Sequence, residues 1–188
     1  MNAIDYSISI TLVSLVGRWP LADSIAVFFA QYAGYGLLIF LAILFLWNRT
    51  YGAVLFQALV AAFISRGILT EAIRFFWHRA RPFETLSFPP LVQKLSEVYA
   101  SFPSGHAAFY FAISIVVFLH SKKMGSIFLA VSFLMGIARI YGGVHWASDI
   151  VGGVLLGIAS GLFISWVFRK TKTSGTNVRI DPAGLSNT

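Results

Sequence analysis

Three arginines in polar stretches of an otherwise apolar chain suit the binding of an anion. Arg74 and Arg81 lie seven residues apart, close to two helical turns, so we expect both guanidinium groups on one face of a helix. Arg139 belongs to a later polar stretch, "ARIYGGVHWASD". Converging arginines repel one another unless an anion lies between them, and guanidinium groups bind phosphate oxygens in pairs. The arginines therefore indicate a phosphate-binding site.

The stretch "PSGH" at residues 103–106 opens an apolar run and adds to this site. Ser104 and Gly105 lie where a helix would begin, and the free N–H groups and dipole of a helix N-terminus favour an anion. Gly105 has no Cβ, so we expect the backbone to approach the phosphate closely there. The expected phosphate-binding residues are Arg74, Arg81, Ser104, Gly105 and Arg139.

Two histidines and an aspartate predict covalent catalysis in addition to binding. Asp149 follows His145 by four residues, which would place its carboxylate beside one ring nitrogen and leave the other free to attack. We therefore predict that His145 is the nucleophile, oriented by Asp149, of a phosphohistidine intermediate. His106 would protonate the leaving oxygen and then activate water. No acidic cluster that suits Mg²⁺ accompanies these residues, so we expect neither a metal nor a cofactor.

The three stretches resemble the three motifs of the type-2 phosphatidic acid phosphatase superfamily, which includes membrane lipid phosphatases and soluble vanadium haloperoxidases. The matching residues, in the family's order and spacing, are Arg81, Pro82, Pro103, Ser104, Gly105, His106, Arg139, His145 and Asp149. The chain departs from the pattern at Arg74, where the family usually has lysine, and at Ala138, where it usually has serine. The resemblance implies a metal-independent phosphatase whose chemistry these departures leave in place.

The elements that position these residues are expected to be membrane helices. The chain is 57% hydrophobic and only 11% charged, whereas a soluble domain is roughly 25% charged. Its apolar runs reach about 20 residues, the length that spans a bilayer core. We predict an all-α polytopic transmembrane bundle of about six helices, at residues 4–17, 22–47, 51–76, 104–120, 124–141 and 148–168. For 4–17 we favour a short span over a helix lying in the interface.

The predicted bundle forms one domain, residues 1–168, followed by a basic polar tail, 169–188, that we expect to be disordered. The net charge of +7 does not indicate nucleic-acid binding, because the basic residues lie at span ends and connectors. There they orient a multi-pass protein in a bacterial plasma membrane. Arg49, Lys122, Lys123 and the tail would face the cytoplasm, and the polar loop 82–102 and the connector 142–147 would face outward with the site.

Other polar residues and a glycine ridge lie near these motifs. Arg66 and Glu71 inside the third helix indicate either a functional pair or a structural ion pair. His78 and Arg79 lie beside the site and are interpreted as contacts for substrate access or for a headgroup. The ridge favours packing within the bundle over dimerisation, and the oligomeric state stays open. The ridge consists of Gly153, Gly157 and Gly161.

The expected substrate is a lipid phosphate or diphosphate whose tail stays in the bilayer. Within the superfamily, "RPF" at residues 81–83 and "WPLADSIAVFFAQY" at 19–32 look most like the bacterial undecaprenyl pyrophosphate phosphatases of the bacitracin-resistance type. That resemblance implies release of phosphate from the C55 isoprenyl diphosphate, which recycles the carrier for cell-wall peptidoglycan synthesis. Phosphatidylglycerophosphate or phosphatidate remains an alternative substrate. A non-catalytic lipid or anion transporter remains an alternative of another class.

Overall fold

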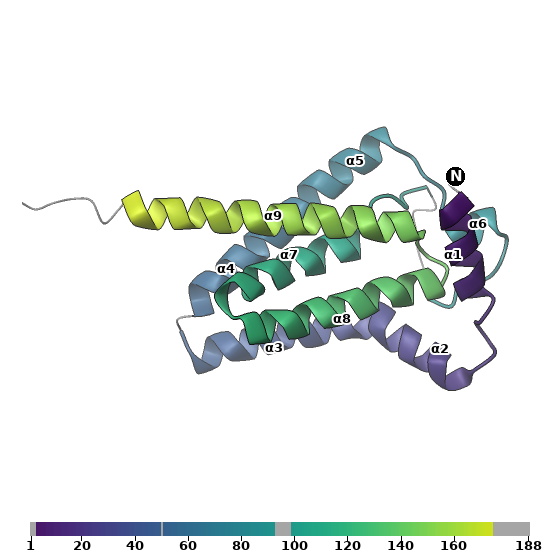
Figure 1. Ribbon diagram of the computed structural model, residues 1–188, viewed down its shortest axis with the longest axis horizontal. Coiled ribbons are helices and arrows are strands. Elements are labelled where there is room, and N and C mark those ends of the chain that lie inside the picture. The colour runs from purple at the N-terminus through teal and green to yellow at the C-terminus, as the bar shows by residue number, and fades with distance from the viewer. Residues whose placement is uncertain (1–2, 50, 93–98, 175–188) are drawn as a thin grey trace, which may run out of the picture.

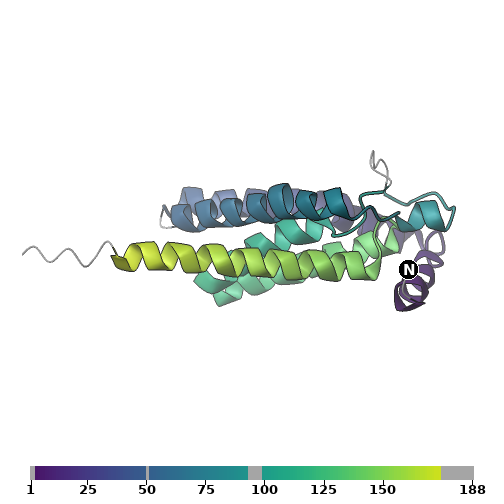
Figure 2. The same ribbon diagram turned by 90° about the horizontal axis from the view of Figure 1, so that it is seen from above.

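The computed structural model describes residues 3–49, 51–92 and 99–174. All regular secondary structure in these ranges is helical. The helices form a bundle of long rods with polar loops gathered at one end (Figures 1 and 2). Two rods are interrupted by a π-helical turn: α2 (Pro20–Val27), η1 (Phe28–Tyr32) and α3 (Ala33–Trp47), then α4 (Tyr51–Ala62), η2 (Phe63–Leu69) and α5 (Thr70–Phe76). The others are α7 (Gly105–His120), α8 (Lys122–Tyr141) and α9 (Ala147–Ser174). The predicted all-α bundle is confirmed.

Four of the rods are long and apolar enough to cross a bilayer, with mean hydropathies from 1.7 to 2.1 over their best windows. They are Pro20–Trp47, Tyr51–Phe76, Lys122–Tyr141 and Ala147–Thr171. By contrast, α1 (Ala3–Val13) has 11 residues, which is about 16 Å of helix against a hydrocarbon core of about 30 Å. It lies across the end of the bundle rather than along it (Figure 1). The structure therefore supports the interfacial alternative for this segment, not the span that we favoured.

The centre of the bundle is α7, which packs closely against α9. The glycine ridge of α9 makes this possible, because a side chain there would collide with the α7 backbone. A Cβ added at Gly153 would lie 2.5 Å from the Ser104 carbonyl oxygen, and one at Gly157 would lie 2.6 Å from that of Ala108. The prediction that the ridge packs within the bundle is confirmed.

The two ends of the bundle differ in composition. The α3–α4 and α7–α8 connections and the C-terminal part of α9 share one end (Figure 1), which carries the basic residues Arg49, Lys122, Lys123, Arg169 and Lys170. At the other end lie α1, α6 (Pro82–Thr85), the segment before α7 and the α8–α9 connection. The three polar motifs therefore meet at the end opposite to the basic one.

Two predicted boundaries need correction or fall outside the described ranges. We expected a disordered tail from residue 169, but α9 continues to Ser174. Residues 175–188 lie outside the described residues. The expected loop 82–102 contains the short helix α6, and its residues 93–98 also lie outside the described part of the chain.

Candidate active site

Main-chain hydrogen bonds join three segments that are distant in the sequence. Arg79 and Ala100 form a parallel β-bridge, in which the Arg79 N–H donates to the Tyr99 carbonyl at 3.0 Å and the Ser101 N–H to the Arg79 carbonyl at 3.0 Å. The Ser104 N–H then donates to the Asp149 carbonyl at 2.9 Å. The segment before α7 is thus held between the residues after α5 and the start of α9, which brings all three polar motifs together.

His145 and Asp149 form a buried pair at the start of α9. His145 lies in the connector before the helix and Asp149 in its first turn, with 1% and 0% of their surfaces exposed. His145 Nδ1 lies 3.4 Å from Asp149 Oδ2. The same oxygen accepts the Trp146 N–H at 2.8 Å. Trp146 is the residue before the helix, and an acidic side chain in the third helical position often accepts the N–H of that residue. Asp149 therefore serves as both a helix cap and a partner of the imidazole.

The environment of His145 keeps its ring neutral. Burial, followed by the positive charges of Arg139, Arg81 and Arg74, holds the pKa of His145 well below its usual value. Because Nδ1 is directed at Asp149, the lone pair of a neutral ring lies on Nε2. Nε2 in turn lies 3.3 Å from Arg81 Nη1. This geometry presents an unprotonated ring nitrogen beside a guanidinium group, an arrangement that suits attack on a phosphorus atom whose oxygens the guanidinium binds.

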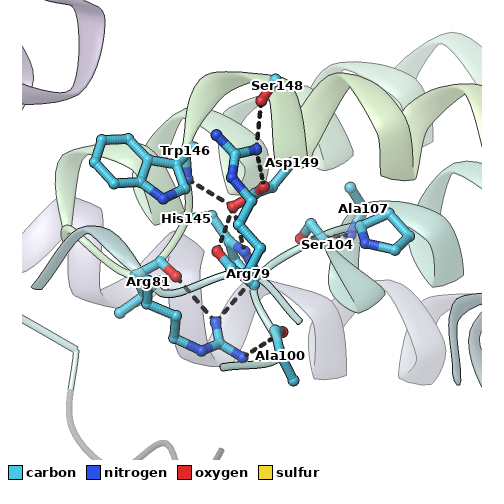
Figure 3. Close-up of polar contacts among 12 residues, drawn as sticks. Arg79, Arg81, Ala100, Ser104, Ala107, His145, Trp146, Ser148 and Asp149 are labelled. Carbon is cyan, nitrogen blue, oxygen red and sulfur yellow. Dashed lines mark hydrogen bonds and ion pairs between the residues drawn. The ribbon is translucent and has the colours of Figure 1, made fainter. Parts of the chain in front are cut away.

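Arg74 and Arg81 approach the site from different elements. Our prediction that they share one helix face is wrong, because α5 ends at Phe76 and Arg81 is in extended backbone with φ −79° and ψ 157°. Pro82 explains the extended conformation of Arg81, since the residue before a proline is disfavoured from the helical region. Arg81 nevertheless donates to the Val144 carbonyl at 2.9 Å and to the Ala100 carbonyl at 3.1 Å (Figure 3).

The other two arginines complete the positive charge around His145. Arg74 is buried and donates to the Pro103 carbonyl at 3.0 Å, next to the start of α7. Arg139, in the last turn of α8, is 4% exposed and donates through Nη1 to the Ala30 carbonyl at 3.1 Å. Its Nε is buried without a hydrogen-bond partner among the described residues. A buried N–H that lacks an acceptor is costly, so this atom favours an anion.

The start of α7 holds the remaining predicted residues. Ser104 caps the helix, because its Oγ accepts the Ala107 N–H at 3.5 Å. We expected Gly105 to clear space for a phosphate, but a Cβ there would lie 2.3 Å from Nε of Arg66. The missing Cβ therefore makes room for an arginine side chain. His106 follows in the first turn and is exposed.

Arg79 has a role that the sequence did not indicate. Its Nη1 donates to Asp149 Oδ1 and to Ser148 Oγ, both at 2.7 Å (Figure 3), and its Nη2 donates to Asp5 Oδ2 at 2.8 Å. Both ends of this guanidinium are thus engaged by carboxylates of the protein, which argues against our interpretation of Arg79 as a contact for substrate access or for a headgroup. The exposed His78 has no such contacts among those described. Arg79 acts instead as a positioning residue behind Asp149.

Asp5 and Ser101 support the same carboxylate and were also missed. Asp5 accepts from the Ser148 N–H at 2.8 Å and from the Ser148 hydroxyl at 2.6 Å, which ties α1 to the first turn of α9. Burial raises the pKa of the Asp5 carboxyl, but the hydrogen bonds from Ser148 and Arg79 outweigh it and hold that pKa below its usual value. The buried Ser101 hydroxyl donates to Asp149 Oδ2. No local pattern in the sequence could have joined residues 5, 79, 101 and 149.

Ala138, the second departure from the family pattern, lies outside this polar network. It is buried in an apolar cluster with Ala26, Ala30, Val92 and Val144. A methyl group fits these neighbours, so the chain replaces the usual hydroxyl with apolar packing beside Arg139.

Comparison with known proteins gives consistent matches over most of the chain. Residues 55–173 match the family model described as the PAP2 superfamily. The chain is 34% identical over 155 residues to the "Bacitracin transport permease protein BcrC" of Bacillus licheniformis, covering 81% of this chain and 75% of that protein. It is 27% identical over 160 residues to the "Undecaprenyl-diphosphatase BcrC" of Bacillus subtilis (strain 168), covering 84% of this chain and 81% of that protein. The crystal structure of a transmembrane PAP2 type phosphatidylglycerolphosphate phosphatase from Bacillus subtilis superposes with a TM-score of 0.61 and 26% identity, covering 90% of this chain and 88% of that one.

Proposed function

The chain belongs to the PAP2 superfamily and is a membrane lipid phosphatase, and from this premise we propose that it hydrolyses undecaprenyl diphosphate to undecaprenyl phosphate and inorganic phosphate. The observation that carries the chemistry is the buried His145, held between Asp149 and Arg81. The similarity to a protein named as an undecaprenyl-diphosphatase over 84% of this chain supports the choice of lipid.

In the first step of the proposed reaction, Arg74, Arg81 and Arg139 bind the terminal phosphoryl group of the lipid diphosphate. The Nε2 lone pair of His145 attacks the phosphorus, and the bond from phosphorus to the bridging oxygen breaks. His106 gives its proton to that oxygen, which leaves as the lipid monophosphate. The three guanidinium groups stabilise the negative charge on the transferring phosphoryl oxygens.

In the second step, water replaces the lipid. His106, now unprotonated, takes a proton from a water molecule, which attacks the phosphorus and breaks its bond to Nε2. Inorganic phosphate leaves, and both histidines return to their starting states. Asp149 holds His145 in the required tautomer throughout and stabilises the charge that the ring carries in the intermediate.

The start of α7 contributes hydrogen-bond donors to the same phosphoryl group. The Ser104 oxygen accepts the Ala107 N–H, so its own hydrogen remains available to donate to the phosphate. The backbone N–H groups of Gly105 and His106 belong to the first turn of α7, where no intrahelical acceptor exists for them. These donors and the helix dipole add to the charge of the arginines.

The proposed location is a bacterial plasma membrane, with the site on the extracytoplasmic side and the C-terminus in the cytoplasm. The basic residues at the far end of the bundle support this orientation, because cytoplasmic connectors carry the excess of lysine and arginine. Residues 1–168 would act as one catalytic domain.

The test is phosphate release by the detergent-purified protein and its His145→Ala variant from undecaprenyl diphosphate, phosphatidylglycerophosphate and phosphatidate, assayed in parallel. We expect release that requires His145 and has its highest kcat/KM on the isoprenyl diphosphate. Preference for a glycerolipid would contradict the proposed substrate and leave the mechanism intact. The variant must elute as the wild type does on size exclusion, so that loss of turnover is not loss of folding.

The alternative from another class, an anion or lipid transporter, has one observation in its favour. Buried arginines around an Arg139 N–H that lacks an acceptor in the described part of the chain would bind phosphate whether or not chemistry follows. A transporter would bind all three lipids without releasing phosphate, and His145→Ala would leave that binding unchanged. Release of phosphate by the wild type and not by the variant excludes this alternative.

A further inference from the structure

Arg66 lies outside the motifs but is fixed at the edge of the site. It belongs to the π-helical turn η2, and such turns within α-helices are often functional. The preceding residue, Ser65, is fully buried and donates from Oγ to the Ala108 carbonyl of α7 at 3.1 Å. Thr70 Oγ1 donates to the Ser65 carbonyl at 2.8 Å and secures the turn. The backbone that carries Arg66 is therefore held against α7.

The side chain of Arg66 crosses the first residue of α7. A Cβ added at Gly105 would lie 2.3 Å from Nε and 2.5 Å from Cδ of Arg66, so only glycine admits this contact. His106, the proposed general acid, is the next residue. Arg66 is thus adjacent to the proton donor of the proposed reaction.

Arg66 remains accessible, unlike the arginines of the motifs. Its side chain is 40% exposed, whereas that of Arg74 is 8% exposed. Glu71 pairs with both, forming an ion pair with Arg66 and lying 3.3 Å from Nη1 of Arg74. One carboxylate between two guanidinium groups leaves this trio with a net charge of about +1. Glu71 thereby orients Arg66 without cancelling the attraction of the trio for an anion.

We propose that Arg66 binds the second phosphoryl group of a diphosphate substrate, the one that lies between the reacting phosphorus and the lipid tail. This inference rests on the proposed function and adds a selectivity to it. When the phosphorus–oxygen bond breaks, the bridging oxygen takes its proton from His106, and the departing lipid phosphate carries negative charge beside that residue. The guanidinium of Arg66 lies there to bind it. A monophosphate substrate has no group at this position, so Arg66 selects diphosphates.

The test compares two substrates with one tail, farnesyl diphosphate and farnesyl phosphate, in detergent micelles. The quantity measured is the ratio of their kcat/KM values for the wild type, Arg66→Gln and Arg66→Lys. We expect Arg66→Gln to lower the ratio of diphosphate to monophosphate by about tenfold or more, the effect of losing a charge-assisted hydrogen bond. Arg66→Lys should restore part of it, because the charge returns without the planar fork. Arg49→Gln, a matched loss of charge at the far end of the bundle, should leave the ratio unchanged.

Because the ratio is taken within one preparation, it does not depend on the fraction of protein that is folded. An unchanged ratio in Arg66→Gln would overturn the inference. If both activities fell equally, Arg66 would be a support of the fold rather than a determinant of selectivity. A wild type that hydrolyses only the monophosphate would instead contradict the proposed function. The two failures are therefore distinguishable.

Discussion

His145 Nδ1 lies 3.4 Å from Asp149 Oδ2, and both side chains are buried at the start of α9. This relationship fixes which ring nitrogen can react. The carboxylate favours the tautomer with a proton on Nδ1, and it stabilises the positive charge that the ring acquires when Nε2 becomes phosphorylated. The separation is longer than in a strong hydrogen bond, and such contacts often tighten when substrate binds.

The substitution Asp149→Asn tests this orienting role. An amide can donate as well as accept, so it would favour the wrong tautomer of His145, and we expect kcat to fall by roughly 10²- to 10⁴-fold. Phosphate release under saturating substrate measures it. Ser101→Ala is the milder companion, since it removes one donor to Asp149 and leaves the carboxylate, and we expect a loss of about tenfold. An Asp149→Asn enzyme with a third or more of the wild-type kcat would rule out the role.

Arg79→Gln distinguishes a positioning residue from a headgroup contact. The substitution leaves Asp149 buried with one charged partner fewer, so we expect a lower Tm and a lower kcat, with KM within about threefold of the wild type. Headgroup binding would appear chiefly as a raised KM. The ion pair between Arg79 and Asp5 provides a second measurement. Because the two side chains interact, Asp5→Asn should lower the Tm less in the Arg79→Gln variant than in the wild type. Additive losses would contradict that link.

The lowered pKa of His145 predicts the pH at which the ring charges. A free imidazole is half protonated near pH 6.5, whereas His145 should stay neutral well below that pH, because burial and three arginines oppose its charge. The unfolded chain then binds the proton first, so this residue's contribution to stability falls as pH drops below about 6.5. Histidine NMR of ¹⁵N-labelled protein in micelles, with His145→Asn to assign the signal, measures the pKa. Half protonation of His145 at or above pH 6.5 would contradict this prediction.

Removal of divalent metals should leave turnover unchanged, because arginine side chains supply the positive charge that the phosphoryl group needs. The measurement is phosphate release after dialysis against EDTA, with a second sample to which Mg²⁺ is returned. A clear loss that Mg²⁺ reverses would show that the arginines do not suffice.

The sequence was most informative where its patterns are local. The long apolar runs predicted the rods, and the four-residue spacing of His145 and Asp149 predicted their pairing, because both depend on neighbours in the chain. The spacing of Arg74 and Arg81 misled us, because we assumed one helix through both residues. The helix ends at Phe76, and Pro82 favours extended backbone at Arg81.

Contacts between distant segments could not be predicted from the sequence. Nothing near Arg79 indicates that Asp5 will meet it from a helix lying across the end of the bundle. Gly105 was identified from its motif, but the Arg66 side chain that fills the space of its missing Cβ depends on how η2 packs on α7. Such contacts are set by tertiary packing and carry no periodicity that could be read in advance.

The most direct test of the central claim is to trap the phosphorylated enzyme. The wild type and His145→Ala would be mixed with undecaprenyl diphosphate carrying ³²P in its terminal phosphoryl group, stopped with alkali within the first turnover, and separated from lipid by gel electrophoresis. We predict ³²P on the wild-type protein that is stable to alkali and lost in acid, as for a phosphohistidine, and none on the variant. Phosphate release by a wild type that never carries label, or equal labelling of His145→Ala, would contradict the assignment of His145 as the nucleophile.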